Sequence, residues 1–189
     1  MDLEYEIIRD KIIRFPRVLS KYDYAKLVED SNPAWEPNIY ISDKGGPTRW
    51  ETIYKYNNIT PEGKFLFETM HEVSVFFSEQ ILGKTSSLSA GLNLNGYSED
   101  IAHVSKYRIN GAVMPHTDEE ETEDSGWHTI IWYLNDDYTG GELGFTGEPD
   151  IEIKAEAGDV YIYPFYMEHY ANPVTDGFKY IAIRREKFY

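Results

Sequence analysis

The second half of the chain repeats one pattern, in which short apolar or alternating segments are separated by Gly, Asn, Asp or Pro. The segments begin near residue 90 and are GLNLNGYS, IAHVSKYRIN, WHTIIWYLN, GGELGF, DIEIKA, GDVYIYP and FKYIAIRRE. Val, Ile and Tyr fit pleated strands, and many short strands with turn residues between them are typical of antiparallel two-layer folds. We therefore expect a mostly β protein of the α+β class, whose later half is a sandwich or jelly roll.

The first 90 residues carry two helical patterns instead. One starts at Ser20 (SKYDYAKLVED), with the serine as the N-cap. The other is ITPEGKFLFETMHEVSVFFSEQILG, where Thr60 is a suitable N-cap, Pro61 fits the first turn and Gly83 is placed to end the helix. These helices are expected to pack on one sheet of the later half.

Between the two helices, the stretch from Ser31 to Trp50 holds three prolines and two adjacent glycines. This composition predicts an exposed loop or an irregular hairpin. We find no convincing linker. Residues 1–189 are therefore expected to form a single domain, with residues 1–90 as a helical or mixed supporting region and residues 91–189 carrying the site.

Composition excludes several function classes. The 189 residues include no cysteine, so thiolate metal sites, iron–sulfur clusters and cysteine nucleophiles are absent. The net charge of −15 disfavours nucleic acid and anionic lipid as partners. Neither a secretory signal nor a membrane-spanning run of apolar residues is evident, so we expect a cytoplasmic protein with no membrane partner.

Any metal chemistry falls to carboxylates and to the five histidines. His116 and Asp118 are two residues apart, so in an extended segment their side chains leave the same face. His169 follows the predicted strand GDVYIYP. Two imidazoles and one carboxylate form the ligand set that suits non-haem Fe(II), although a His-x-Asp pair on its own often arises by chance.

Lys179 lies ten residues beyond His169 and completes an ordered series. In the order His116, Asp118, His169 and Lys179, the chain resembles the Fe(II)/2-oxoglutarate-dependent dioxygenases of the prolyl 4-hydroxylase-like branch. Three further segments match that branch over roughly residues 100 to 185: KYRINGAVMPHTD, IIWYLNDDYTGGELGF, and AGDVYIYP followed later by PVTDGFKY. The resemblance implies a double-stranded β-helix, that is, a jelly roll, as the core.

The resemblance also implies roles for individual residues. His116, Asp118 and His169 would bind Fe(II), and 2-oxoglutarate would chelate the iron through its C1 carboxylate and keto oxygen, leaving a place for dioxygen. Lys179 would anchor the C5 carboxylate, Tyr133 would donate to the same carboxylate, and Tyr107 would donate within the same pocket. For both tyrosines, packing on a strand is the competing interpretation. Ascorbate is a candidate reductant.

The branch implies hydroxylation of a prolyl residue in a peptide or protein, with release of succinate and carbon dioxide. Two alternatives stay open. One is a hydroxylase of a free amino acid, another side chain or a small metabolite, because family likeness is a weak guide to substrate. The other is a metal-binding jelly-roll module without turnover. An acidic interaction protein is suggested by net charge alone and is disfavoured.

Two segments are candidates for binding a substrate, namely the stretch from Ser31 to Trp50 and the acidic run that follows Asp118. That run is either a solvated loop or a negative rim that attracts a basic peptide.

The remaining polar residues have plainer interpretations. Asp159 is expected to hold a turn, and His71 to lie on the surface or pack on its helix. His103 and His128 are expected to support the structure or the ligands. Arg184 and Arg185 are alternatives to Lys179 as the anchor, or substrate contacts.

Overall fold

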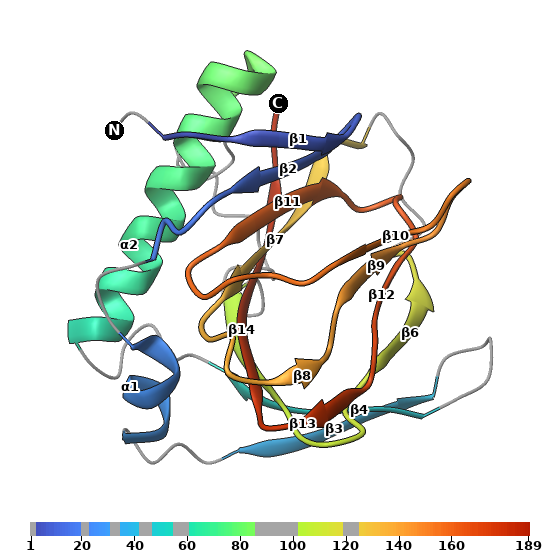
Figure 1. Cartoon of the computed structure of the whole chain (residues 1–189). Coiled ribbons are helices and arrows are strands. Elements are labelled where there is room, and N and C mark those ends of the chain that lie inside the picture. Colours follow the sequence, from blue (N-terminus) through green and yellow to red (C-terminus); the bar gives the residue numbers. More distant parts are fainter. Residues whose placement is uncertain are drawn as a thin grey trace.

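The computed structural model describes residues 3–19, 23–30, 35–41, 47–54, 61–85, 102–118 and 125–189. Most of the described strands belong to two antiparallel sheets (Figure 1). In spatial order the larger sheet contains β1 (Glu6–Arg9), β2 (Ile12–Phe15), β11 (Val160–Pro164), β7 (Trp127–Tyr133), β14 (Lys179–Lys187), β5 (Ala102–Tyr107), β4 (Pro47–Tyr54) and β3 (Glu36–Ile41). The smaller sheet contains β10 (Ile151–Ile153), β9 (Leu143–Phe145), β12 (His169–Ala171) and β6 (Val113–His116), and a separate pair is formed by β13 (Val174–Asp176) and β8 (Thr139–Gly140). The expected mostly β fold with a jelly-roll core is confirmed, while the predicted strand GLNLNGYS lies outside the described residues.

Two helices cover the outer face of the larger sheet (Figure 1): α1 (Tyr24–Asp30) and α2 (Pro61–Phe76), which continues as the π-helical segment η2 (Phe77–Leu82). The long helix begins at Pro61 and ends at Gly83, whose φ of +62° is the left-handed conformation that glycine tolerates best. The cap of α1 differs from the prediction. Asp23 Oδ1 accepts the N–H of Lys26 at 2.9 Å, so Asp23 caps the helix, and Ser20 lies outside the described residues. No helix in the described ranges is both long and apolar enough to cross a membrane.

The N-terminal region adds strands as well as helices to the fold. β2 pairs with β11 and β4 pairs with β5, so two separate segments of the predicted supporting region extend the larger sheet. β3 and β4 form a regular antiparallel hairpin within the stretch predicted as a loop or irregular hairpin. Residues 31–34 and 42–46 of that stretch are not described. Backbone pairing along six consecutive positions explains the regular geometry despite three prolines, two of which lie in the hairpin strands.

Alternation along the central strands divides the core into two layers. In β7, Ile130 and Trp132 pack toward the helices, whereas Ile131 and Tyr133 pack toward the smaller sheet. Successive side chains of a strand point to opposite faces, so a residue's parity decides which layer it enters. On β7 and β14, the odd-numbered residues therefore face the space between the two sheets.

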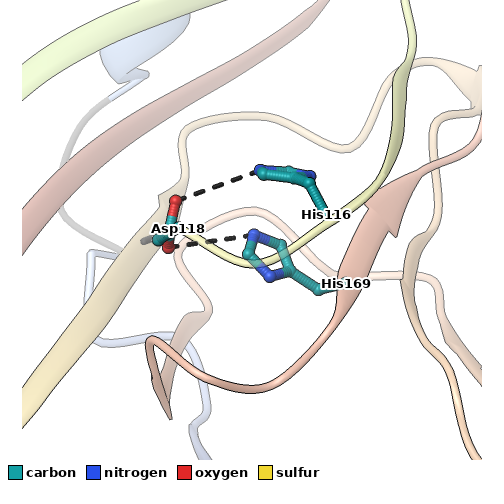
Figure 2. Close-up of side chains that lie close together, drawn as sticks. All are labelled: His116, Asp118 and His169. Carbon is teal, nitrogen blue, oxygen red and sulfur yellow. Dashed lines mark ion pairs between the residues drawn. The ribbon is translucent and has the colours of Figure 1, made fainter. Parts of the chain in front are cut away.

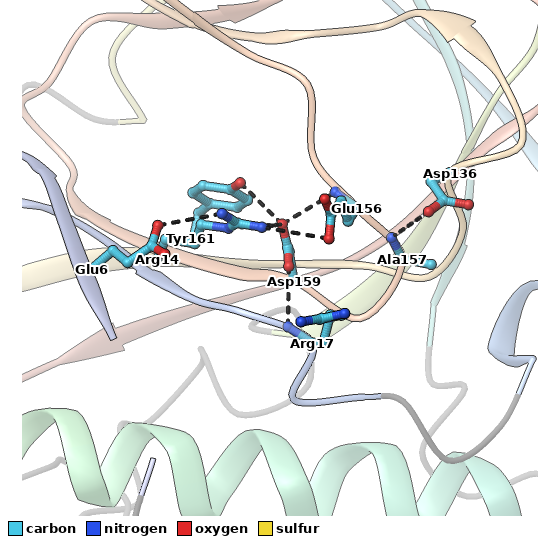
Figure 3. A network of polar contacts seen from close by, with 8 residues as sticks. All are labelled: Glu6, Arg14, Arg17, Asp136, Glu156, Ala157, Asp159 and Tyr161. Carbon is cyan, nitrogen blue, oxygen red and sulfur yellow. Dashed lines mark hydrogen bonds and ion pairs between the residues drawn. The ribbon is translucent and has the colours of Figure 1, made fainter. Parts of the chain in front are cut away.

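Asp159 ties the N-terminal hairpin to the jelly roll (Figure 3). Its side chain is fully buried and accepts hydrogen bonds from the Arg14 guanidinium at 2.9 and 3.0 Å, from the backbone N–H of Arg17 and Glu156, each at 3.1 Å, and from the hydroxyl of Tyr161 at 3.2 Å. The prediction that Asp159 holds a turn is confirmed by its bond to Glu156. Its bonds to Arg14 and Arg17 extend that role to the β2–β11 junction.

Replacing Asp159 by alanine is expected to lower the free energy of unfolding by about 3 kcal/mol, because a partly buried cation and two backbone donors lose their fully buried acceptor together. Denaturant-induced unfolding at neutral pH measures the change. The matched control is Glu6→Ala, which removes a half-exposed partner of the same Arg14 and should cost at most about 1 kcal/mol. Equal losses in the two variants would contradict a structural role for the Asp159 contacts.

Candidate active site

Three of the predicted residues meet between the two sheets (Figure 2). His116 ends β6, Asp118 follows two residues later, and His169 begins β12, where it pairs in register with His116. Their candidate ligand atoms all lie within 4.8 Å of one another. Each imidazole Nε2 is 3.9 Å from a different oxygen of Asp118. The three donors can therefore converge on one ion.

Backbone carbonyls orient both imidazoles. His116 Nδ1 lies 2.9 Å from Met114 O, and His169 Nδ1 lies 2.9 Å from Met167 O. A carbonyl can only accept, so each Nδ1 carries the proton and each Nε2 presents its lone pair toward Asp118. Burial lowers the pKa of His169 to about 4, which keeps this imidazole neutral at pH 7.

The carboxylate of Asp118 is held by groups of the larger sheet. Arg185 Nη2 donates to Oδ1 at 2.9 Å, and the Thr129 hydroxyl donates to Oδ2. Burial raises the pKa of Asp118, but the imidazoles, Arg185 and Thr129 outweigh burial, so the pKa lies below its ordinary value. Asp118 is therefore ionised, as a metal ligand must be.

Lys179 occupies a second polar position in the same layer, at the start of β14. Its side chain is 1% exposed, and its Nζ donates to the carbonyl of Gly141 at 2.7 Å. The ammonium lies 5.1 Å from the ring centre of Tyr107 and 5.2 Å from that of Tyr133. No carboxylate in the described ranges lies within ion-pair distance of Nζ, and burial lowers the pKa of Lys179 to about 7. Such a lysine is suited to an anion that enters the pocket.

Gly141 makes room for this lysine. Its φ is +68°, and a Cβ at this position would lie 3.1 Å from Lys179 Cδ and from Tyr138 Cε2. Both the backbone conformation and the space therefore favour glycine at the second position of the Gly-Gly-Glu-Leu segment.

Residues 102–184 match the 2OG-Fe(II) oxygenase superfamily, and this range contains the triad and Lys179. Over these residues the chain is similar to the members of this superfamily. The chain is 34% identical over 92 residues to a PKHD-type hydroxylase of Alteromonas mediterranea. The match covers 47% of this chain and 39% of the relative, so the chain spans well under two thirds of the curated relative that it matches.

Solved structures share the fold of this chain over nearly its whole length. A prolyl hydroxylase of Trichoplax adhaerens, in complex with a hypoxia inducible factor peptide fragment, has a TM-score of 0.67 at 11% identity, with 94% of this chain and 83% of that one covered. The viral collagen prolyl hydroxylase of Paramecium Bursaria Chlorella virus-1, in complex with 2-oxoglutarate, has a TM-score of 0.62 at 14% identity, with 94% and 97% covered. At these identities the likeness concerns the fold.

The donor set fits Fe(II) and 2-oxoglutarate, the two cofactors of the matched superfamily. Two neutral imidazoles and an ionised carboxylate suit non-haem Fe(II) and leave further coordination positions open. The buried ammonium of Lys179 suits a carboxylate of a dicarboxylic acid such as 2-oxoglutarate.

The remaining histidines and the two neighbouring arginines lie in different parts of the fold. His71 is exposed on α2, and His128 packs against Phe77 and Phe188 on the helix side, which makes it structural. The side chain of His103 is outside the described part of the structure. Arg184 has the opposite parity to Lys179 and lies 3.6 Å from Glu186, so it does not reach the pocket as an anchor. Arg185 contacts Asp118 instead.

Two site residues were not predicted from the sequence. Thr129 donates to Asp118, and Tyr163 lies beside His169, with 4.7 Å between ring centres. Thr129 could have been found because it shares its parity with Tyr133 on the same strand. Tyr163 carried no comparable signal, since the chain contains 16 tyrosines.

Proposed function

We propose that the protein is an Fe(II)- and 2-oxoglutarate-dependent dioxygenase that hydroxylates a prolyl residue in a peptide or protein and releases succinate and carbon dioxide. We also propose that residues 1–189 act as one oxygenase domain. The observation that carries the catalytic part is the pairing of a convergent His116, Asp118 and His169 triad with a buried lysine that has no carboxylate partner in the described chain.

In this proposal each residue has a distinct task. His116, Asp118 and His169 hold the metal, and their carbonyl, threonine and arginine contacts fix the direction of the donor atoms. Lys179 holds the C5 carboxylate of 2-oxoglutarate, and the hydroxyl groups of Tyr133 and Tyr107 donate within the same pocket. With iron bound, 2-oxoglutarate and dioxygen supply the oxidising chemistry, and the chain provides anchoring, orientation and exclusion of water.

The prolyl substrate is supported by the branch resemblance of the sequence and by the prolyl hydroxylases among the structural neighbours. Proline-containing peptides incubated with the protein, Fe(II), 2-oxoglutarate, ascorbate and oxygen should gain the mass of one oxygen atom on proline, as read by tandem mass spectrometry. Peptides in which alanine replaces that proline should stay unmodified. Oxidation of the alanine peptides at an equal rate would count against the prolyl substrate.

The affinity for 2-oxoglutarate is expected to depend on pH through Lys179. The free protein has a Lys179 pKa of about 7, and a bound carboxylate favours the charged form. Affinity should therefore be constant below pH 7 and fall by up to about tenfold per unit above it, because binding then requires uptake of a proton. Anaerobic titrations at saturating metal from neutral to alkaline pH measure this slope. Lys179→Met removes the titrating group and should flatten the profile, whereas a flat profile in the unmodified protein would refute the coupling.

A further inference from the structure

Arg185 stands in a row of polar residues across three strands. Tyr163 of β11 pairs in register with Thr129 of β7, which pairs with Arg185 of β14. Thr129 and Arg185 both donate to Asp118, so this row borders the candidate metal position. Lys179 is six residues earlier on the same strand and shares the parity of Arg185. The inner face of β14 thus carries two cations beside the site.

The two cations differ in exposure. Lys179 is buried in the core, whereas the side chain of Arg185 is 41% exposed. The Arg185 guanidinium also lies over the ring of Phe165, with its Cζ 5.8 Å from the ring centre. Lys179 is therefore placed for a small molecule that is fully enclosed, and Arg185 for a group that reaches the site from solvent.

The polar row of β11, β7 and β14 has more hydrogen-bond donors than the described chain has acceptors for them. A guanidinium has five N–H donors. The described acceptor for Arg185 is Asp118, which takes a bond from Nη2, while the buried Nε has no hydrogen-bond partner in the described chain. The buried hydroxyl of Tyr163 likewise has no partner there. Buried donors are normally satisfied, so two such donors beside one site indicate a ligand that brings acceptor oxygens.

The balance of charges in the site also indicates an anionic ligand at Arg185. In the metal-free protein, Arg185 and Asp118 neutralise each other. With Fe(II), Asp118, dianionic 2-oxoglutarate and protonated Lys179 together, the charges inside the site cancel and that of Arg185 is left over. An uncompensated, half-exposed cation at such a position attracts an anion, and the guanidinium has N–H donors beyond the one that Asp118 accepts.

We propose that Arg185 is a specificity-determining residue that binds a carboxylate of the substrate to be hydroxylated. This inference rests on the proposed function. The carboxylate comes either from an acidic side chain close to the target proline in a peptide, or from the α-carboxylate of a free amino acid. The acidic run after Asp118, which would favour a basic peptide, lies at 119–124 outside the described residues.

The test uses the full chain loaded anaerobically with Fe(II) and 2-oxoglutarate, and it measures binding by calorimetry. The probes are proline-centred pentapeptides with Glu, Gln or Lys beside the proline, together with free L-proline and L-prolinamide. The matched control is Lys187→Gln, which removes a cation from the same face of β14, two residues further along. Formation of the charge-transfer band of the loaded site is recorded separately.

We expect the Glu peptide to bind at least about tenfold more tightly than the Gln peptide, and Arg185→Gln to abolish this preference while Lys187→Gln retains it. A preference for L-proline over L-prolinamide that depends on Arg185 would support the same contact with the free amino acid as its source. If the charge-transfer band forms but no preference for a carboxylate depends on Arg185, this inference alone is overturned. Tighter binding of the Lys peptide than of the Glu peptide would overturn it as well. Absence of the band would overturn the proposed function and this inference with it.

Discussion

Asp118→Ala is expected to lower succinate release by roughly three orders of magnitude or more, because two imidazoles without the carboxylate bind Fe(II) weakly and in an undefined geometry. The fold should survive. Arg185 loses a partner but is 41% exposed and can be hydrated, while Thr129 loses one acceptor. Coupled measurements of succinate release, metal binding by calorimetry and thermal unfolding separate the two effects.

A suitable control for this variant is Asp176→Ala, which removes an exposed carboxylate from β13. Its activity, metal affinity and midpoint of unfolding should match those of the unmodified protein. If Asp118→Ala binds metal and releases succinate as the control does, Asp118 is not a ligand. If it fails to unfold cooperatively, the loss of activity says nothing about metal binding, and Asp118→Asn is then measured in its place.

Lys179→Met is expected to change binding and stability in opposite directions. The affinity for 2-oxoglutarate should fall by roughly a hundredfold, since the cosubstrate loses a charge-assisted hydrogen bond in a buried site. The midpoint of thermal unfolding without 2-oxoglutarate should rise, because methionine fills similar space without the cost of a buried ammonium that already has a depressed pKa. Anaerobic titration and calorimetric melting read the two quantities.

A fall in 2-oxoglutarate affinity together with a rise in stability distinguishes a lysine that binds the cosubstrate from one that supports the structure. A lysine kept for structure would lower stability when replaced and leave the affinity for 2-oxoglutarate unchanged. Lys26→Met, which removes an exposed cation from α1, should alter neither quantity by much. Unchanged affinity in Lys179→Met would move the anchor to another group and contradict the assignment of Lys179.

The sequence predicted the site where local rules decide geometry. His116 and Asp118 lie two positions apart, and the periodicity of an extended segment predicts that they leave the same face. In the structure β6 ends at His116, and Asp118 lies just beyond the strand. Period and turn residues also located α2 with its ends at Pro61 and Gly83. The fold class followed from the same alternation in the later half of the chain.

Contacts between distant strands could not be predicted in the same way. Arg185 meets Asp118 only because β14 pairs with β7 in one particular register, and the two residues are 67 positions apart. A shift of that register by one residue would bring Arg184 to the site instead. The contribution of β1 and β2 was missed because their apolar residues are interleaved with charges, and those charges include Arg14, the partner of Asp159.

The most direct test of an Fe(II) and 2-oxoglutarate site in this chain is an anaerobic titration of the protein with both, followed by admission of oxygen. We expect a metal-to-ligand charge-transfer band that saturates at one equivalent of each and a release of succinate once oxygen enters. Neither a band nor succinate, even with proline-containing peptides present, would contradict the assignment of this chain as a 2-oxoglutarate-dependent oxygenase.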